Sequence, residues 1–580
     1  MTFLLHMSKK IIAACLGCSL GLILPSSAQT KTTAPEIDLI LHNGVIYDGS
    51  GSLPYRGQIA IRGDKIVYVG THRKMTAKSV IDVKGKAIAP GFINMLSHME
   101  ESVFIDGRAL SDLAQGVTLE VLGEDSMGPI PASVQKSMEA AQGDIKYKVN
   151  WTSFGEYLKV IEQRGLGPNV AALVGAGTVR NYVLGSEDIA ANPTQLQSMR
   201  KLVRQAMREG ALGLTTALIY VPNTFATTEE LIALAKESAT CGGIFSAHMR
   251  SEGDRIEAAV DEMITIAKAS KAPVEIYHLK FAGKDNWHKI DPIIKKIEAA
   301  RAQGLHITAD MYTYTAGATG LDAAMPSWVQ AGGLAAWIKR LQDPATRAKV
   351  IAEMRNPHPK DWENLYGGAS AEGTMLLGFK TAKLKPLTGK SLAQVAKERG
   401  VSPEDIAVDL VIEDGSRIEV AYFLMDEKNL RKQVALPWVS FGSDAAGAAP
   451  NGIFLQASAH PRTYGNFARV FAQYVRKDKV LSIQEAVRKL SALPASTLSI
   501  KDRGSLQSGN YADVVVFDPE KIQDHATFSK PHQLATGVEH VLVNGKFALR
   551  DGIATGVATG RIIKGSAANA GSKEYAACLD

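Results

Sequence analysis

Residues 244–310 decide the fold class of this 580-residue chain, because three short apolar runs alternate there with two helix-like segments. The runs read IFSAH (244–248), VEIYH (274–278) and LHITAD (305–310). The segments between them carry the apolar spacing of amphipathic helices, and Gly or Pro precedes the next run. Strands that alternate with helices in this way predict βαβ units and a parallel sheet.

Two of these runs end in histidine, at His248 and His278. In a parallel barrel the carboxyl ends of all strands open on one face, so both imidazoles are expected to project into the same cavity. Neutral imidazole is a common ligand of zinc, and a catalytic zinc site needs a third protein ligand from elsewhere in the chain. One histidine alone could equally cap a strand or pack in the core. The pair at equivalent positions favours a metal site.

The amino terminus has the three parts of a secretory signal. Lys9 and Lys10 precede an apolar segment at 11–24, and the small residues Ser26, Ser27 and Ala28 follow it. This pattern predicts a signal peptide at 1–28, cleaved after Ala28. The apolar segment is shorter than the about 20 residues that span a bilayer. We therefore expect an exported protein, periplasmic or secreted, with no membrane span in the mature chain.

The composition is that of an ordinary globular protein. The apolar fraction is 46%, the charged fraction is 21% and the formal net charge is +6. No basic tract indicates nucleic-acid binding. Once the signal is removed, Cys241 and Cys578 are the remaining cysteines. Because one ends a barrel helix and the other lies in the tail, a disulfide framework is not expected.

Short strands with turns occur at both ends of the chain, at 36–90 and 500–565. Neither set is expected to bury a core alone, so together they predict a small β-sandwich. Between them, 91–499 predicts an α/β fold of the (β/α)8 TIM-barrel type, with an inserted lid subdomain at about 323–386 because the last two strands are too far apart for one βα unit. The eight strand candidates end near Leu96, Gly123, Gly175, Thr216, His248, His278, Asp310 and Asp444.

Several short motifs follow one another in an order typical of one family. They are APGFI (89–93), QGVT (115–118), GALGLTT (210–216), HMRSEG (248–253), HLK (278–280), DMYTY (310–314), GSD (442–444), HPR (460–462) and GNYAD (509–513). In this order the chain resembles the amidohydrolase superfamily, and specifically the N-acyl-D-amino-acid deacylase (D-aminoacylase) family. The resemblance implies zinc-dependent hydrolysis of the amide of an N-acyl-D-amino acid or a related D-residue peptide.

The resemblance also implies roles for individual residues. His248 and His278 would ligate the zinc ion, and Asp444 would be the general base. A carboxylate at this place can take a proton from water and later deliver it to the leaving amine. Asp before a Gly- and Ala-rich turn is also a common helix N-cap. The motif context favours the catalytic role for Asp444.

Two departures from the family pattern concern the metal ligands. The usual His-x-His pair reads Leu96-Ser97-His98, so one ligand is missing. We therefore expect one zinc ion, and His98 could be a ligand, a substrate contact or structural. The family's cysteine ligand is also absent. Counting from Gly116-Val117-Thr118 places Asp125 at the position of that cysteine, whereas the neighbouring Glu124 has the longer side chain. One carboxylate with two imidazoles is a known set of zinc ligands.

Four residues could bind the carboxylate of an acyl-amino acid, namely Lys280, Arg250, Tyr314 and Arg462. The resemblance favours Lys280 and a tyrosine of the segment 310–314. Each of the four could equally be solvated or salt-bridged.

Two alternatives to the deacylase interpretation stay open. One is a cyclic-amide or dipeptide hydrolase on the same scaffold, with other groups anchored in the pocket. The other is a catalytically impaired exported binding protein, because two usual ligand positions are altered. The joint presence of His248, His278 and Asp444 favours an enzyme.

Overall fold

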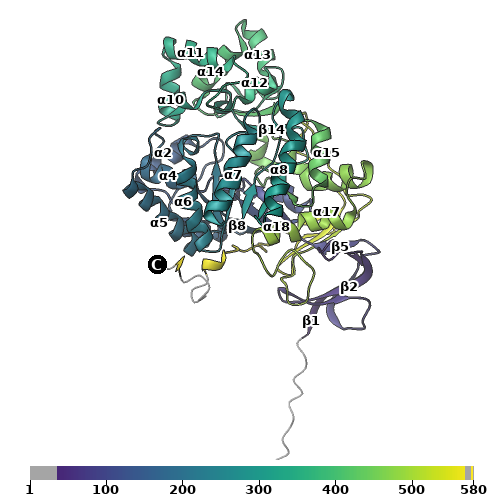
Figure 1. Ribbon diagram of the computed structural model, residues 1–580. Coiled ribbons are helices and arrows are strands. Elements are labelled where there is room, and N and C mark those ends of the chain that lie inside the picture. The colour runs from purple at the N-terminus through teal and green to yellow at the C-terminus, as the bar shows by residue number, and fades with distance from the viewer. Residues whose placement is uncertain (1–35, 569–576, 579–580) are drawn as a thin grey trace, which may run out of the picture. The chain divides into compact units, whose positions relative to one another are not determined.

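The computed structural model describes residues 36–568 and 577–578 (Figure 1). The predicted signal peptide at 1–28 lies outside them. The chain divides into one unit at 1–36 and a second at 37–580, and the second contains the barrel, the sheet and the inserted subdomain. In the described part, no helix is both long and apolar enough to cross a membrane.

Eight parallel strand positions form the barrel at the centre of the molecule. Asp444 N–H donates to the carbonyl of Leu96 at 2.9 Å, and Ser97 pairs with Ala445, so the last strand closes onto the first. The predicted (β/α)8 architecture is therefore confirmed. In order around the ring the strands are β6 (Phe92–Ser97), β7 (Val117–Leu122), β8 (Asn169–Ala172) continued by β9 (Val174–Gly175), β10 (Gly213–Ala217), β11 (Ile244–His248), β12 (Val274–Ile276), β13 (Ile307–Met311) and β17 (Val439–Phe441).

Amphipathic helices surround these strands, and their ends follow local sequence signals. In α5 (Pro193–Glu209), Asn192 caps the first turn and Pro193 occupies the first helical position. Both residues suit a helix start, because the cap satisfies a free N–H and proline has none. One face of α5 is buried against the barrel. Further helices are α3 (Phe154–Gln163), α6 (Thr228–Thr240), α7 (Ile256–Ser270), α8 (Ile290–Ala302) and α17 (Ile483–Leu490) (Figure 1).

The two ends of the described chain meet in a single nine-stranded sheet. Strand β5 (Ala87–Pro90) runs antiparallel to β18 (Val514–Phe517), with Ile88 opposite Val516. Apolar residues from both ends contribute to one buried cluster, so the two ends share a core. The remaining strands are β1 (Ile37–Ile46), β2 (Tyr55–Arg62), β3 (Lys65–Gly70), β4 (Ala77–Asp82), β19 (Val538–Val543), β20 (Lys546–Arg550) and β21 (Ile553–Ala554).

The inserted subdomain, hereafter the lid, is wider than the predicted 323–386. It begins with β14 (Ala316–Gly320), which pairs antiparallel with β16 (Glu419–Phe423), and β16 also pairs with β15 (Thr374–Gly378). The glycine-rich β14 has no apolar alternation, so its sequence does not signal a strand. The lid has its own buried cluster and contains α10 (Leu334–Leu341), α11 (Pro344–Met354), α13 (Leu392–Arg399) and α14 (Pro403–Asp414) (Figure 1).

A disulfide joins Cys241 to Cys578, so the prediction of no disulfide is wrong. Cys241 follows α6, and both cysteines are buried. The two positions are 337 residues apart in sequence. The prediction failed because separation along the chain does not show that the carboxyl-terminal tail returns to the barrel helices.

Candidate active site

Three residues from three barrel strands meet at the carboxyl-terminal face of the barrel. Glu124 Oε1 lies 3.0 Å from His248 Nδ1 and 2.7 Å from His278 Nε2. His248 ends β11, His278 follows β12 by two residues and Glu124 follows β7 by two residues. The backbone N–H of Glu124 donates to Thr215 Oγ1 at 3.0 Å, which fixes the turn that presents its side chain.

This group of Glu124, His248 and His278, hereafter the metal-type group, fits a divalent metal ion. One potential ligand atom from each residue lies within 4.8 Å of the other two. Both imidazoles are almost fully buried, at 4% and 2% exposed for His248 and His278. Two imidazole nitrogens with one carboxylate oxygen form a catalytic zinc set that leaves a position for water or substrate.

Asp444 faces the same cavity from the end of β17. Its Oδ1 lies 3.0 Å from His98 Nε2, and its Oδ2 lies 2.7 Å from Arg462 Nη1. Burial would raise the pKa of Asp444, but the charges of Arg462 and His278 and the hydrogen bond from His98 outweigh this effect. The pKa of Asp444 is therefore held well below its usual range, and the side chain is a carboxylate at neutral pH.

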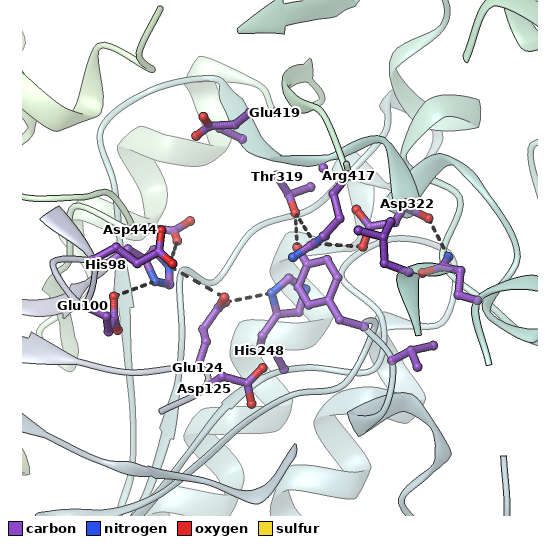
Figure 2. A pocket seen from close by; sticks show the side chains of 18 of the residues that line it. His98, Glu100, Glu124, Asp125, His248, Thr319, Asp322, Arg417, Glu419 and Asp444 are labelled. Atoms are coloured by element: carbon purple, nitrogen blue, oxygen red, sulfur yellow. Dashed lines mark hydrogen bonds and ion pairs between the residues drawn. The ribbon is translucent and has the colours of Figure 1, made fainter. Parts of the chain in front are cut away.

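His98 stands between the two carboxylates of the site, as Figure 2 shows. Its Nε2 lies 3.7 Å from Glu124 Oε2. Burial lowers the pKa of His98, but the hydrogen bond to Asp444 and the charges of Glu100 and Glu124 raise it to about 9. His98, Glu124 and Asp444 form a second group with ligand atoms close together, and this group shares Glu124 with the first.

Glu124 and Asp125, between which the sequence did not decide, have different surroundings in the structure. Asp125 is exposed and accepts a hydrogen bond from Asn223 at 3.4 Å. Among the described residues, it belongs to neither of the two groups of potential metal ligands that contain Glu124. Glu124 adopts a positive φ of 68°, and its longer side chain points toward His248 (Figure 2) and lies within 3.0 Å of both imidazoles. Counting along the strand placed Asp125 at the ligand position because it cannot detect such a turn.

Lys280 and Arg462 both lie beside Tyr312, which belongs to the predicted segment 310–314 but is not the tyrosine named there. The Lys280 ammonium lies 5.6 Å and the Arg462 guanidinium 4.4 Å from the centre of the Tyr312 ring. All three residues are buried, and the Tyr312 hydroxyl has no hydrogen-bond partner in the described part of the chain. These groups lie next to the metal-type group, because Lys280 Nζ is 2.7 Å from His278 Nδ1.

Two predicted substrate contacts are placed elsewhere. Arg250 pairs with Glu262 at 3.0 Å and donates to the carbonyls of Thr224 and Ala226, so the hydrogen-bonding groups of its guanidinium are occupied by neighbouring parts of the barrel. Tyr314 packs against Arg469, whose guanidinium lies 5.1 Å from its ring centre. In the segment DMYTY, Tyr312 is therefore the tyrosine beside Lys280 and Arg462.

A cavity of about 560 Å³ opens over the metal-type group, with one wall from the barrel and one from the lid. Its lining is acidic. Arg417 is the one lysine or arginine among the described lining residues, and it pairs with Asp322 at 2.8 Å. Glu419 also faces the cavity, and it makes no hydrogen bond or ion pair to the other side chains drawn in Figure 2. The lining carboxylates besides Glu124, Asp322 and Asp444 are Glu100, Glu101, Asp125 and Glu419.

Comparisons with known proteins agree with this geometry. The sequence profile of the Amidohydrolase family matches residues 79–548. D-aminoacylase of Alcaligenes xylosoxydans xylosoxydans is 30% identical over 93% of this chain and 100% of its own length. N-acyl-D-glutamate deacylase of the same organism is 30% identical over 93% of this chain and 99% of its own length.

A solved structure shows the same fold. The N-acyl-D-glutamate deacylase of Bordetella bronchiseptica, complexed with zinc and a phosphonate inhibitor, superposes with a TM-score of 0.75 at 26% identity. The match covers 91% of this chain and 100% of that one. The sequence resemblance is thus confirmed, and this chain belongs to the amidohydrolase family, among the relatives of D-aminoacylase.

Proposed function

We propose that this protein is an exported zinc-dependent deacylase, which hydrolyses the amide of N-acyl-D-amino acids or of related peptides that contain a D-residue. The observation that carries the proposal is the group of Glu124, His248 and His278 beside the ionised Asp444. The relatives known as D-aminoacylase and N-acyl-D-glutamate deacylase support the class of substrate.

The residues divide the chemistry between them. Glu124, His248 and His278 would hold one zinc ion, which supplies a Lewis acid that polarises the amide carbonyl and acidifies a water molecule. Asp444 accepts the proton of the attacking water and delivers it to the nitrogen of the leaving amine. His98 and Arg462 each contact one oxygen of Asp444, so they hold its carboxylate in place.

Lys280, Tyr312 and Arg462 form the proposed anchor for the substrate carboxylate. They are not among the residues that line the cavity, and the two cations are already paired, Lys280 with Glu252 and Arg462 with Asp444. Lys280 nevertheless contacts His278, and both His278 and Asp444 line the cavity. A carboxylate can accept from an ammonium, a hydroxyl and a guanidinium at once, and charge-assisted hydrogen bonds are the strong ones. The buried hydroxyl of Tyr312 has no partner among the described residues, which suits a donor kept for a ligand. An anchored carboxylate places the adjacent amide toward the zinc ligands.

The charge of the cavity favours substrates with neutral or cationic side chains. Asp125 and Glu419 present carboxylates to the cavity, whereas Arg417 is already paired with Asp322. A second negative charge on the substrate would meet repulsion here, because like charges in a partly desolvated site destabilise each other. We therefore propose D-leucine- or D-lysine-like residues over D-glutamate or D-aspartate.

Export to an oxidising compartment, periplasmic or extracellular, is the final part of the proposal. The signal-like pattern at residues 1–28 and the disulfide between Cys241 and Cys578 both support it. Structural disulfides persist mainly outside the reducing cytosol.

The test combines metal content with a substrate panel. Purified protein should contain zinc and hydrolyse N-acetyl-D-leucine and N-acetyl-D-lysine faster than the L-isomers and faster than N-acetyl-D-glutamate. Turnover of a cyclic amide but of no acyl-amino acid would favour the alternative hydrolase. Metal-free protein that binds an acyl-amino acid without hydrolysing it would favour a binding protein.

A further inference from the structure

Glu252 lies behind the metal-type group and contacts the outer sides of both imidazoles. Its Oε1 is 2.9 Å from His278 Nδ1, and its Oε2 is 3.6 Å from His248 Nε2. The inner nitrogens, Nδ1 of His248 and Nε2 of His278, face Glu124. One carboxylate, only 2% exposed, therefore spans the outer nitrogens of two prospective ligands.

The two rings face Glu124 through different nitrogens, so each needs a different tautomer. A neutral imidazole offers a lone pair at one nitrogen only when the proton sits on the other. A carboxylate behind the ring accepts that proton as a hydrogen bond and so fixes both tautomer and orientation. His248 Nε2 has no hydrogen-bond partner within range in the described chain, and the Glu252 oxygen at 3.6 Å is the acceptor that faces it.

Glu252 also binds the proposed substrate anchor. Lys280 Nζ donates to Glu252 Oε1 at 2.7 Å and lies equally close to His278 Nδ1. Because an ammonium has only donors, Lys280 competes at Nδ1 with the proton that metal binding through Nε2 requires, and the Glu252 oxygen is the acceptor that lies within reach of both donors. A lysine cation so near a ligand opposes the binding of a metal ion, and the Glu252 carboxylate offsets this charge. The backbone of Glu252 is held as well, since its N–H donates to Glu363 at 3.0 Å and its carbonyl accepts from Ala282 at 2.8 Å.

We propose that Glu252 is a positioning residue, which sets the tautomers of His248 and His278 for metal binding and holds Lys280 beside them. The inference rests on the metal site of the proposed function but not on its substrate. It joins metal affinity and substrate anchoring through one side chain.

The experiment measures zinc affinity by chelator competition, independently of turnover. Glu252→Gln keeps the shape but can accept from only one imidazole, so its affinity should fall 10- to 100-fold, the range for outer-shell partners. Glu252→Asp keeps the charge but is too short to span both rings, and it should lose at least fivefold. Glu120→Gln, a fully buried barrel carboxylate that binds Asn94, is the matched control and should stay within threefold of wild type.

A double variant separates geometry from charge. Glu252→Gln combined with Lys280→Met restores the wild-type net charge but not the carboxylate. The zinc affinity of this double variant should therefore remain at least fivefold weaker than that of the wild type. The absorption spectrum of the cobalt-substituted Glu252→Gln protein should also differ from wild type. Recovery of wild-type affinity in the double variant, or unchanged affinity in folded Glu252→Asp, would overturn the inference. If the wild type retains zinc but hydrolyses no acyl-amino acid, the proposed function fails and this inference stands.

Discussion

The barrel wall and the lid wall of the cavity are built in different ways. On the barrel side, Glu124, His278 and Asp444 each follow a strand by two or three residues, and they have positive φ angles of 68°, 35° and 50°, respectively. On the lid side, Arg417 and Glu419 are exposed and belong to a subdomain with its own core. From this difference we infer that the barrel residues carry the proposed chemistry and that the lid residues tune the preference among substrates.

The backbone of the barrel wall supports this division. A positive φ at a residue other than glycine costs on the order of 1–3 kcal/mol, and it persists where the surroundings over-determine it. Asp444 is held by its N–H bond to Leu96, and His278 by its N–H bond to Asp310 at 3.0 Å. Substitutions of Glu124, His278 or Asp444 should therefore strongly reduce catalysis, whereas substitutions on the lid should change the relative rates with different substrates.

The largest effect is expected on the barrel wall, for Asp444→Asn. The amide cannot accept a proton from water, so kcat/KM for the best N-acetyl-D-amino acid should fall by about 10²–10⁴, the range for a lost general base. Zinc content should remain at the wild-type level, because Glu124, His248 and His278 are unchanged. Asp125→Asn is the matched control. Asp125 lines the same cavity, but its substitution should lower kcat/KM less than threefold. Steady-state kinetics and metal analysis measure these two quantities. A folded Asp444→Asn enzyme with the wild-type rate would show that Asp444 is not the general base.

A smaller effect is expected at the substrate anchor, for Tyr312→Phe. Loss of one hydrogen bond to a charged group costs about 1.5–3 kcal/mol, so KM should rise by about 10- to 100-fold. Tyr314→Phe is the comparison, because Tyr314 lies two residues away and packs against Arg469. Equal KM values for the two variants would place the substrate carboxylate elsewhere.

On the lid wall, Glu419→Gln should change selectivity by a few fold only. An exposed charge pair contributes about 0.2–1 kcal/mol, so the preference for N-acetyl-D-lysine over N-acetyl-D-glutamate should narrow about two- to fivefold. The rate with uncharged N-acetyl-D-leucine should not change. A comparable loss with all three substrates would show that Glu419 serves the chemistry and that the division between the walls is wrong.

The two walls also differ in how far the sequence predicts them. The barrel strands and their histidines follow from apolar runs and from the rule that parallel strands end on one face. The choice between Glu124 and Asp125 depends on one turn of positive φ, and the choice between Tyr312 and Tyr314 depends on the direction of the chain after β13. Such local geometry leaves no periodic signal.

Long-range pairing accounts for the remaining errors. The lid boundary was missed because β14 pairs with β16, which lies about a hundred residues further along the chain, as Gly317 opposite Tyr422 illustrates. The disulfide was missed for the same reason. A single sequence records which residues can pair across such distances but not which of them meet.

The smallest effect on catalysis is expected furthest from both walls, at the disulfide. Cys578→Ser frees the carboxyl-terminal tail from α6, on the outside of the barrel, so kcat/KM should stay within twofold of wild type. The free energy of unfolding should nevertheless fall by about 2–4 kcal/mol, because the cross-link restricts the unfolded chain. Chemical denaturation of both proteins measures this, and reduction of the wild type should reproduce it while leaving the variant unchanged. A variant that loses activity in proportion to stability would show that the tail shapes the strand ends, so that the barrel wall would depend on more than the strands that carry it.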